Sequence, residues 1–190
     1  MTVVPPVAPF AVRSGYGATR PGGNHWGVDL PGRAGQVVRT PESGIVVAIE
    51  RGAGTSIALR PPFDGYGPGA VLIHGDSGVW HLLAHVKLLP VGLMVGSQVE
   101  AGAVVGVMPR AVGKAGPHTH WEVRVHKPID SPRDRHANTI DPKAWLLASA
   151  AQTGGGLVDI AQRVKARVVA HETARIGGLL FLLWLVLRRR

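Results

Sequence analysis

Cysteine is absent from this sequence of 190 residues, which excludes disulfide bonds and thiolate metal ligands. The N-terminus lacks the basic segment of a secretory signal peptide, and prolines interrupt its apolar residues, so we expect no signal peptide. The apolar run at residues 176–187 is too short to cross a membrane alone. As a helix it would rise about 18 Å, against a hydrocarbon core of about 30 Å.

Helical periodicity is scarce before residue 141, whereas short β-branched or apolar runs bounded by glycine, proline, aspartate or serine recur along the chain. These runs lie at residues 37–38, 45–49, 56–59, 70–73, 79–86, 103–108 and 119–125. They predict a small, mainly β domain with two packed or rolled antiparallel sheets and an active site in a groove. The long glycine- and proline-rich break at residues 51–69, with Phe63 and Tyr66, is a candidate wall of that groove.

Histidine is the residue type that points to chemistry. His25-Trp-Gly-Val-Asp29, His85, and the pair His118-Thr-His120 offer imidazole and carboxylate groups, the usual nitrogen and oxygen donors of zinc. A catalytic zinc takes three protein ligands, which His25, Asp29 and one histidine of the pair can supply. The other histidine of the pair and His85 could then orient a water molecule and transfer protons.

The spacing of the pair favours one shared site. Residues two apart in a strand face the same side, so His118 and His120 can serve a single zinc as base and ligand, with Thr119 pointing away. Glu122 lies on the same face and is a candidate carboxylate for fixing an imidazole tautomer.

Two pairs of residues, His25/Asp29 and His81/His85, are spaced four apart, as they would be on one face of a helix. Neither pair indicates a helical metal site. Glycines around His25 and Asp29 favour an irregular strand or loop. His81 and His85 do not form a zincin motif, because Leu82 stands where that motif requires glutamate. The histidines without such a context are interpreted as surface or core residues: His74, His81, His126, His136 and His171. Glu42, Glu50 and Glu100 are interpreted as solvated strand or turn residues.

Taken together, these motifs resemble the lysostaphin-type, LytM-like peptidoglycan metalloendopeptidases. Ser14-Gly-Tyr-Gly and His25-x-Gly-Val-Asp-Leu30 are similar to the opening of that family, Leu83-Ala-His85 to its middle, and Gly116-Pro-His-Thr-His-Trp-Glu-Val123 to its end. The chain departs from the family pattern at Leu83, where tyrosine is usual, and at Val86, where leucine is usual.

The resemblance implies a two-sheet β domain of duplicated hybrid-motif type that binds Zn²⁺. In this implied site His25, Asp29 and His120 are the zinc ligands, and His85 and His118 are the unliganded catalytic pair. The implied activity is hydrolysis of cross-links or stem peptides of bacterial peptidoglycan by zinc-activated water, with Tyr16 or Tyr66 as a candidate oxyanion donor.

The chain is expected to consist of an N-terminal leader at residues 1–12, a metallopeptidase domain at 13–148, a glycine-rich linker at 149–156 and a helical tail at 157–190. Residues 151–190 carry seven basic and two acidic side chains, and Arg188, Arg189 and Arg190 follow the apolar run. This composition predicts that the tail anchors the protein to a membrane, either spanning it or lying in its interface.

The expected protein is a phage-type lytic enzyme that is virion- or membrane-associated and acts on the host cell wall. Its expected partners are peptidoglycan and a membrane, and no nucleic acid. Two alternatives are a non-catalytic LytM-like activator of other wall hydrolases and a structural virion or membrane protein.

Overall fold

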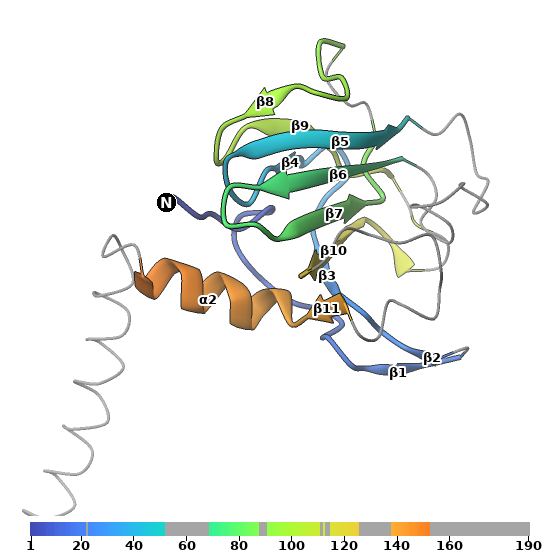
Figure 1. Cartoon of the computed structure of the whole chain (residues 1–190). Helices are drawn as coiled ribbons and strands as arrows, with labels where there is room; N and C mark the ends of the chain where they lie inside the picture. Colours follow the sequence, from blue (N-terminus) through green and yellow to red (C-terminus); the bar gives the residue numbers. More distant parts are fainter. Residues whose placement is uncertain are drawn as a thin grey trace, which may run out of the picture. The chain divides into compact units, whose positions relative to one another are not determined.

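The computed structural model describes residues 1–21, 23–51, 69–87, 91–110, 112, 115–125 and 138–152. The chain divides into two compact units, Met1–Ser149 and Ala150–Arg190. The first unit is mainly β and antiparallel, as the sequence predicted (Figure 1). Several predictions fall outside the described residues: those for the strand at 56–59, Phe63, Tyr66, His126, His136, His171 and the tail at 157–190.

A seven-stranded antiparallel sheet forms the centre of the domain. Its main order is β11-β10-β7-β6-β5-β8, and β3 pairs with β10 off this path. The bounds are β3 Val28–Pro31, β5 Gly44–Glu50, β6 Ala70–Gly75, β7 Trp80–Ala84, β8 Gln98–Val99, β10 His118–Arg124 and β11 Thr139–Ile140. The strands β5, β6 and β7 run side by side in Figure 1.

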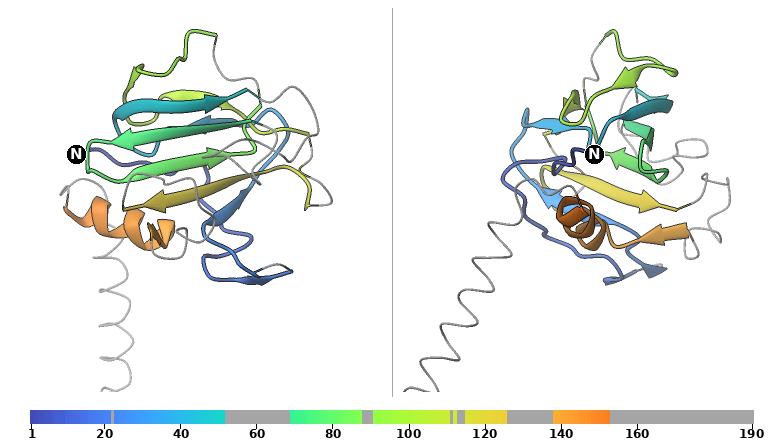
Figure 2. Two further views of the ribbon diagram at one scale, coloured as in Figure 1. Left: turned by 45° about the vertical axis from the view of Figure 1, so that its right-hand side comes forward. Right: turned by 60° about the vertical axis from the view of Figure 1, so that its left-hand side comes forward.

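Two smaller sheets complete the β structure of the described residues. β1 (Thr19–Arg20) pairs with β2 (Gly23–Asn24) in a hairpin, and β4 (Val37–Arg39) pairs with β9 (Val104–Val107). Figure 2 shows the β4–β9 pair beside the main sheet rather than within it. Val38 and Val105 of this pair and Ile73 and Leu83 of the main sheet are buried in one hydrophobic core.

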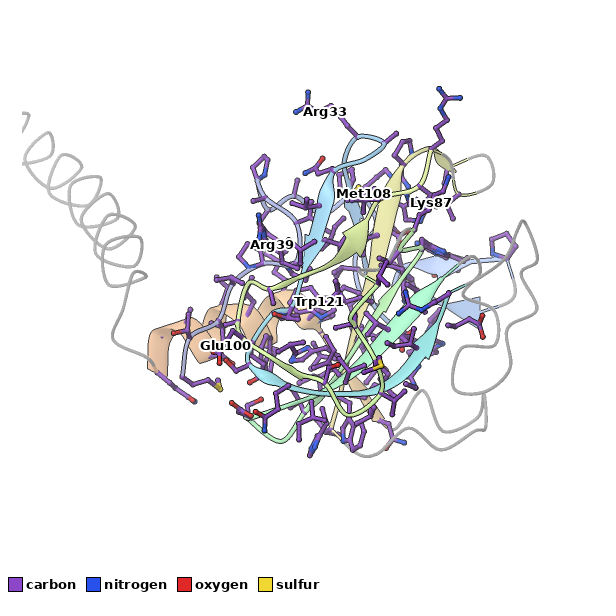
Figure 3. All side chains as sticks on the ribbon, turned by 90° about the horizontal axis from the view of Figure 1, so that it is seen from above. Arg33, Arg39, Lys87, Glu100, Met108 and Trp121 are labelled. Atoms are coloured by element: carbon purple, nitrogen blue, oxygen red, sulfur yellow. The ribbon has the colours of Figure 1, made fainter. Side chains whose placement is uncertain are left out.

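Strand β10 lies between β7 and β3 and pairs with each, and all seven of its residues are buried. Trp121 and Val123 point into the main core. In Figure 3, Trp121 lies inside the layers of strands, whereas Arg33 extends outward. The alternate residues of β10 therefore occupy the opposite face, where the sequence places the two histidines of the His118-Thr-His120 motif.

One α-helix, α2 (Pro142–Gln152), follows strand β11. Asp141 caps it, because its Oδ1 accepts a hydrogen bond from the Lys143 backbone N–H at 2.9 Å. Proline suits the first helical position, because an N–H there would have no acceptor within the helix. Trp145 and Leu146 bury the inner side of the helix against the main core. Among the described residues, no helix has both the length and the apolar character needed to cross a membrane.

Residues before Ser14 lie in the same compact unit as the strands. Val7 is 1% exposed and belongs to the main core. Backbone hydrogen bonds hold this segment, from Val4 N–H to Pro41 O at 2.8 Å and from Arg39 N–H to Pro6 O at 2.9 Å. This path leads the chain directly to the Ser14-Gly-Tyr-Gly motif beside the candidate site.

Candidate metal centre

Three side chains predicted as metal ligands converge in the buried interior. His25 Nε2 lies 2.9 Å from His120 Nδ1 and 3.2 Å from Asp29 Oδ1. His120 Nδ1 lies 3.1 Å from the same carboxylate oxygen. Within the described residues, these three form a group that could hold a metal ion.

Strand pairing brings these ligands together from distant parts of the sequence. β3 pairs with β10 in a register that places Asp29 opposite His120. His25 belongs to the irregular segment before β3, as its glycine-rich surroundings predicted. Gly27 allows the close approach, because a Cβ at this position would lie 2.4 Å from Trp121 O and 2.8 Å from the His120 ring.

Residues between Ser14 and Arg20 fix His25 and Asp29. His25 Nδ1 lies 2.9 Å from the Gly15 carbonyl oxygen, to which it donates, so its Nε2 lone pair is directed at the centre. Backbone bonding between Ser14 and Asp29 holds the carboxylate in place. Arg20 donates to the outer oxygen, Oδ2, and leaves Oδ1 facing the two imidazoles.

A second carboxylate fixes His120. His120 Nε2 lies 3.0 Å from Glu122 Oε1, and Arg124 binds the other oxygen of Glu122 through Nε at 2.8 Å and Nη2 at 2.7 Å. All three residues are buried. Burial lowers the pKa of His120 to about 4, so the imidazole is neutral at pH 7. Its single proton belongs on Nε2, toward Glu122, which leaves the Nδ1 lone pair at the centre.

The chemistry of the donor set fits a cation. A carboxyl group is ionised at neutral pH, and the Arg20 guanidinium contacts the outer oxygen of Asp29. The three atoms that meet are therefore two imidazole lone pairs and one anionic oxygen, a repulsive arrangement unless a positive ion lies among them. Ligand atoms on a tetrahedral zinc, with bonds of about 2.0–2.1 Å, are roughly 3.3 Å apart, close to the separations seen here.

Two further histidines lie beside this group. His118 Nδ1 is 3.0 Å from the Gly116 carbonyl oxygen, and His118 Nε2 is 3.9 Å from Asp29 Oδ1. Burial lowers the pKa of His118, which favours its neutral form. The His85 ring centroid lies 4.9 Å from that of His118 and 6.3 Å from that of His120. The structure thus brings together all five residues singled out in the sequence.

His85 reaches this position through an unusual backbone conformation. It follows the last residue of β7 and has a φ of 60°, the one positive value among described residues other than glycine. Left-handed backbone is disfavoured for a residue with a Cβ, and such conformations cluster at functional sites. The turn directs the imidazole toward His118 instead of along the strand.

The wall next to the site is apolar and built from small or aliphatic side chains. Ala84 pairs with His120, and Leu82 pairs with Glu122, across the β7–β10 ladder. Ala70 and Leu72 of β6 continue the same face in a second buried cluster.

Two interpretations from the sequence need revision. Glu42 is fully buried rather than solvated, and its Oε1 accepts hydrogen bonds from His81 Nε2 at 2.7 Å and Ser77 Oγ at 2.7 Å. The sequence around Glu42 has no alternation of apolar residues that would have predicted its burial. Tyr16, a candidate oxyanion donor, instead donates its hydroxyl to the Thr139 carbonyl oxygen at 2.8 Å.

Sequence reasoning also missed Arg20 and Arg124, which hold the carboxylates of Asp29 and Glu122. For Arg124 a signal existed, because residues two apart in a strand share a face. For Arg20, whose partner lies across a hairpin and a loop, the sequence carried none.

The sequence matches Peptidase family M23 over residues 23–134, more than half of the chain. The structure is similar to the catalytic domain of the antimicrobial peptidase lysostaphin from Staphylococcus simulans, with 22% identity, a TM-score of 0.56, and coverage of 72% of this chain and 92% of that one. It is also similar to a variant of the catalytic domain of the prophage-encoded M23 protein EnpA from Enterococcus faecalis, with 23% identity, a TM-score of 0.53, and coverage of 72% and 91%.

LytU is a third similar structure, with 20% identity, a TM-score of 0.54, and coverage of 72% and 83%. No curated protein matches the sequence. The fold and the buried histidine-aspartate cluster together define a peptidase of the LytM type. The chain belongs to Peptidase family M23.

Proposed function

We propose that this protein is a zinc-dependent endopeptidase that hydrolyses cross-links or stem peptides of bacterial peptidoglycan. The observation that carries the proposal is the meeting of two imidazole lone pairs and a carboxylate oxygen within about 3 Å of one another at a buried site. Family membership supports a peptidase, and the similar fold of lysostaphin, an antimicrobial peptidase, supports the bacterial wall as substrate.

His25, Asp29 and His120 would hold the zinc ion. The chemistry that zinc supplies in such a site is acidification of a water molecule and polarisation of the scissile carbonyl. The small, apolar wall formed by Ala84 and Leu82 would exclude bulk water on one side.

His118 is the better placed of the two remaining histidines to act as base. Its Nδ1 proton is engaged by the Gly116 carbonyl, so its Nε2 lone pair is free to take a proton from the attacking water. As the water oxygen bonds to the carbonyl carbon and the C–N bond breaks, the leaving nitrogen must gain a proton. His118 or its neighbour His85 can donate it.

The complete donor set favours catalysis over the non-catalytic alternative. A protein that only bound and activated other hydrolases would not need three ligand atoms, two further histidines and the Glu122–Arg124 pair behind His120.

The experiment that tests this proposal combines metal analysis with release of amino groups from purified peptidoglycan. The wild-type chain should bind one zinc ion, and His120→Ala should lose it. His118→Ala and His85→Ala should keep zinc and lose roughly 10²- to 10⁴-fold in rate. His74→Ala is the matched control. It also removes a histidine ring, but this ring belongs to β6 and stacks on Trp80, with a centroid distance of 4.3 Å.

Stoichiometric zinc in His120→Ala would contradict the ligand assignment. Wild-type rates in both other variants would contradict the acid-base roles.

The delivery of the enzyme is a separate proposal that rests on sequence alone. The apolar run at 176–187 and the basic residues around it would bind the tail to an anionic membrane, as suits a phage-type lytic enzyme. These residues lie outside the described structure.

A further inference from the structure

Two arginines stand at the edge of the candidate metal centre. Arg20 Nη2 donates to Ser14 Oγ at 2.8 Å and to the outer oxygen of Asp29. Arg13 Nη1 donates to the backbone carbonyl of Ala115. Both side chains are exposed, Arg20 to 40%. Each guanidinium is therefore held by the protein and open to solvent.

Both guanidiniums lie near the proposed base. Ala115 immediately precedes Gly116, whose carbonyl oxygen holds His118 Nδ1 at 3.0 Å. Asp29, which Arg20 contacts, has its inner oxygen 3.9 Å from His118 Nε2.

The charges of the two arginines are not equally compensated. Arg20 is paired with Asp29, so their charges cancel. Arg13 contacts only a neutral carbonyl, and no carboxylate pairs with it in the described part of the chain. A guanidinium has three nitrogen atoms that carry five N–H groups in all. Arg13 contacts described residues through Nη1 alone, and Arg20 through Nη2 alone. The edge of the site thus offers unused donors and one uncompensated positive charge.

We propose that Arg13, supported by Arg20, forms a subsite that binds a free carboxylate on the peptide substrate, close to the scissile bond. The planar fork of a guanidinium matches a carboxylate, and the charge-assisted hydrogen bonds are stronger than neutral ones. The inference rests on the proposed peptidase function and narrows its substrate. It favours stem-peptide cross-links that carry free carboxylates over neutral glycine bridges.

The test compares two synthetic stem-peptide dimers that differ at one group. One has a free carboxylate on the diaminopimelate residue next to the D-alanyl bond, and the other has a carboxamide there. The zinc-loaded full chain should cleave the carboxylate dimer with roughly tenfold or higher kcat/KM, through a lower KM, as expected when a charge-assisted hydrogen bond is present.

Arg13→Gln should remove that preference. The Arg13 side chain contacts Ala115 and no proposed zinc ligand among the described residues, so zinc content should not change. The loss of rate should be larger on the carboxylate dimer than on the carboxamide dimer. Arg39→Gln is the matched control, because Arg39 also donates to a backbone carbonyl, Gly102 O at 2.9 Å, but lies on β4. It should leave the preference intact. Equal losses on both dimers in Arg13→Gln, or no loss on either, would overturn the subsite.

Calorimetric binding of the same dimers separates this inference from the proposed function. Tighter binding of the carboxylate dimer that disappears in Arg13→Gln supports the subsite even if neither dimer is cleaved, in which case only the hydrolytic function fails. Equal binding of both dimers by the wild-type chain overturns the subsite even if both are cleaved.

Discussion

Replacing Glu122 by glutamine should lower both the zinc affinity and the stability of the apo protein, and the two losses can be measured separately. The amide oxygen of Gln can still accept a hydrogen bond from His120 Nε2, but its NH₂ group would face the Arg124 donors, which lie 2.7 and 2.8 Å from Glu122 Oε2. We expect zinc affinity to fall roughly 10- to 100-fold, because His120 loses the carboxylate that orients it. The apo protein should lose about 3–5 kcal/mol of unfolding free energy, because buried Arg124 loses its counter-charge.

Two assays measure these effects independently. Competition with a chromophoric chelator gives the zinc affinity, and urea unfolding with excess chelator gives the stability of the apo protein. The double variant Glu122→Gln/Arg124→Met is the control, since it removes the stranded charge. It should recover much of the stability and none of the zinc affinity. A zinc affinity within about twofold of wild type in Glu122→Gln, with the stability loss present, would show that Glu122 forms only a structural ion pair.

Three more predictions follow from other features. Gly27→Ala should cost about 1–3 kcal/mol and weaken zinc binding, since its Cβ would lie 2.4 Å from Trp121 O; full zinc affinity by the same competition assay would contradict this. Between pH 7 and 5.5 the unfolding free energy should fall by up to about 1.4 kcal/mol per pH unit from His81 alone. Burial lowers its folded pKa, so below its ordinary value of 6.5 only the unfolded chain gains the proton. Urea unfolding of Glu42→Gln/His81→Phe should show a shallower slope against pH, and an unchanged slope would refute the assignment. A chain ending at Gln152 should keep zinc and cleave soluble muropeptides while binding anionic liposomes less than the full chain; loss of cleavage with zinc retained would show that later residues complete the site.

The longest strands were predictable because their apolar periods are unambiguous. The runs at 45–49, 70–73 and 119–125 correspond to β5, β6 and β10, with small differences at their ends. The two-residue strands β1, β2, β8 and β11 were not predicted, because each contains at most one apolar residue and so forms no apolar run. Only their partners in space define them as strands.

The site was predictable to the extent that its residues lie in local motifs. The spacing of His118 and His120 already placed both on one face, and the glycines around His25 already favoured an irregular segment over a helix. The groups that support them are contributed by tertiary contacts. Arg20 reaches Asp29 because a hairpin folds back, and Glu42 is buried because His81 on another strand meets it.

The burial of strand β10 on both faces has a consequence for sequence variation. All seven of its residues are buried: Trp121 and Val123 belong to the main core, and the even-numbered members form or support the metal centre. In β5, by contrast, buried residues are interspersed with accessible ones. Random mutagenesis should therefore reveal an unbroken block of intolerant positions from His118 to Arg124. A substitution in this strand that changes the specificity of the site will usually also destabilise the fold. Variants with new specificity are therefore more readily obtained from residues outside this strand.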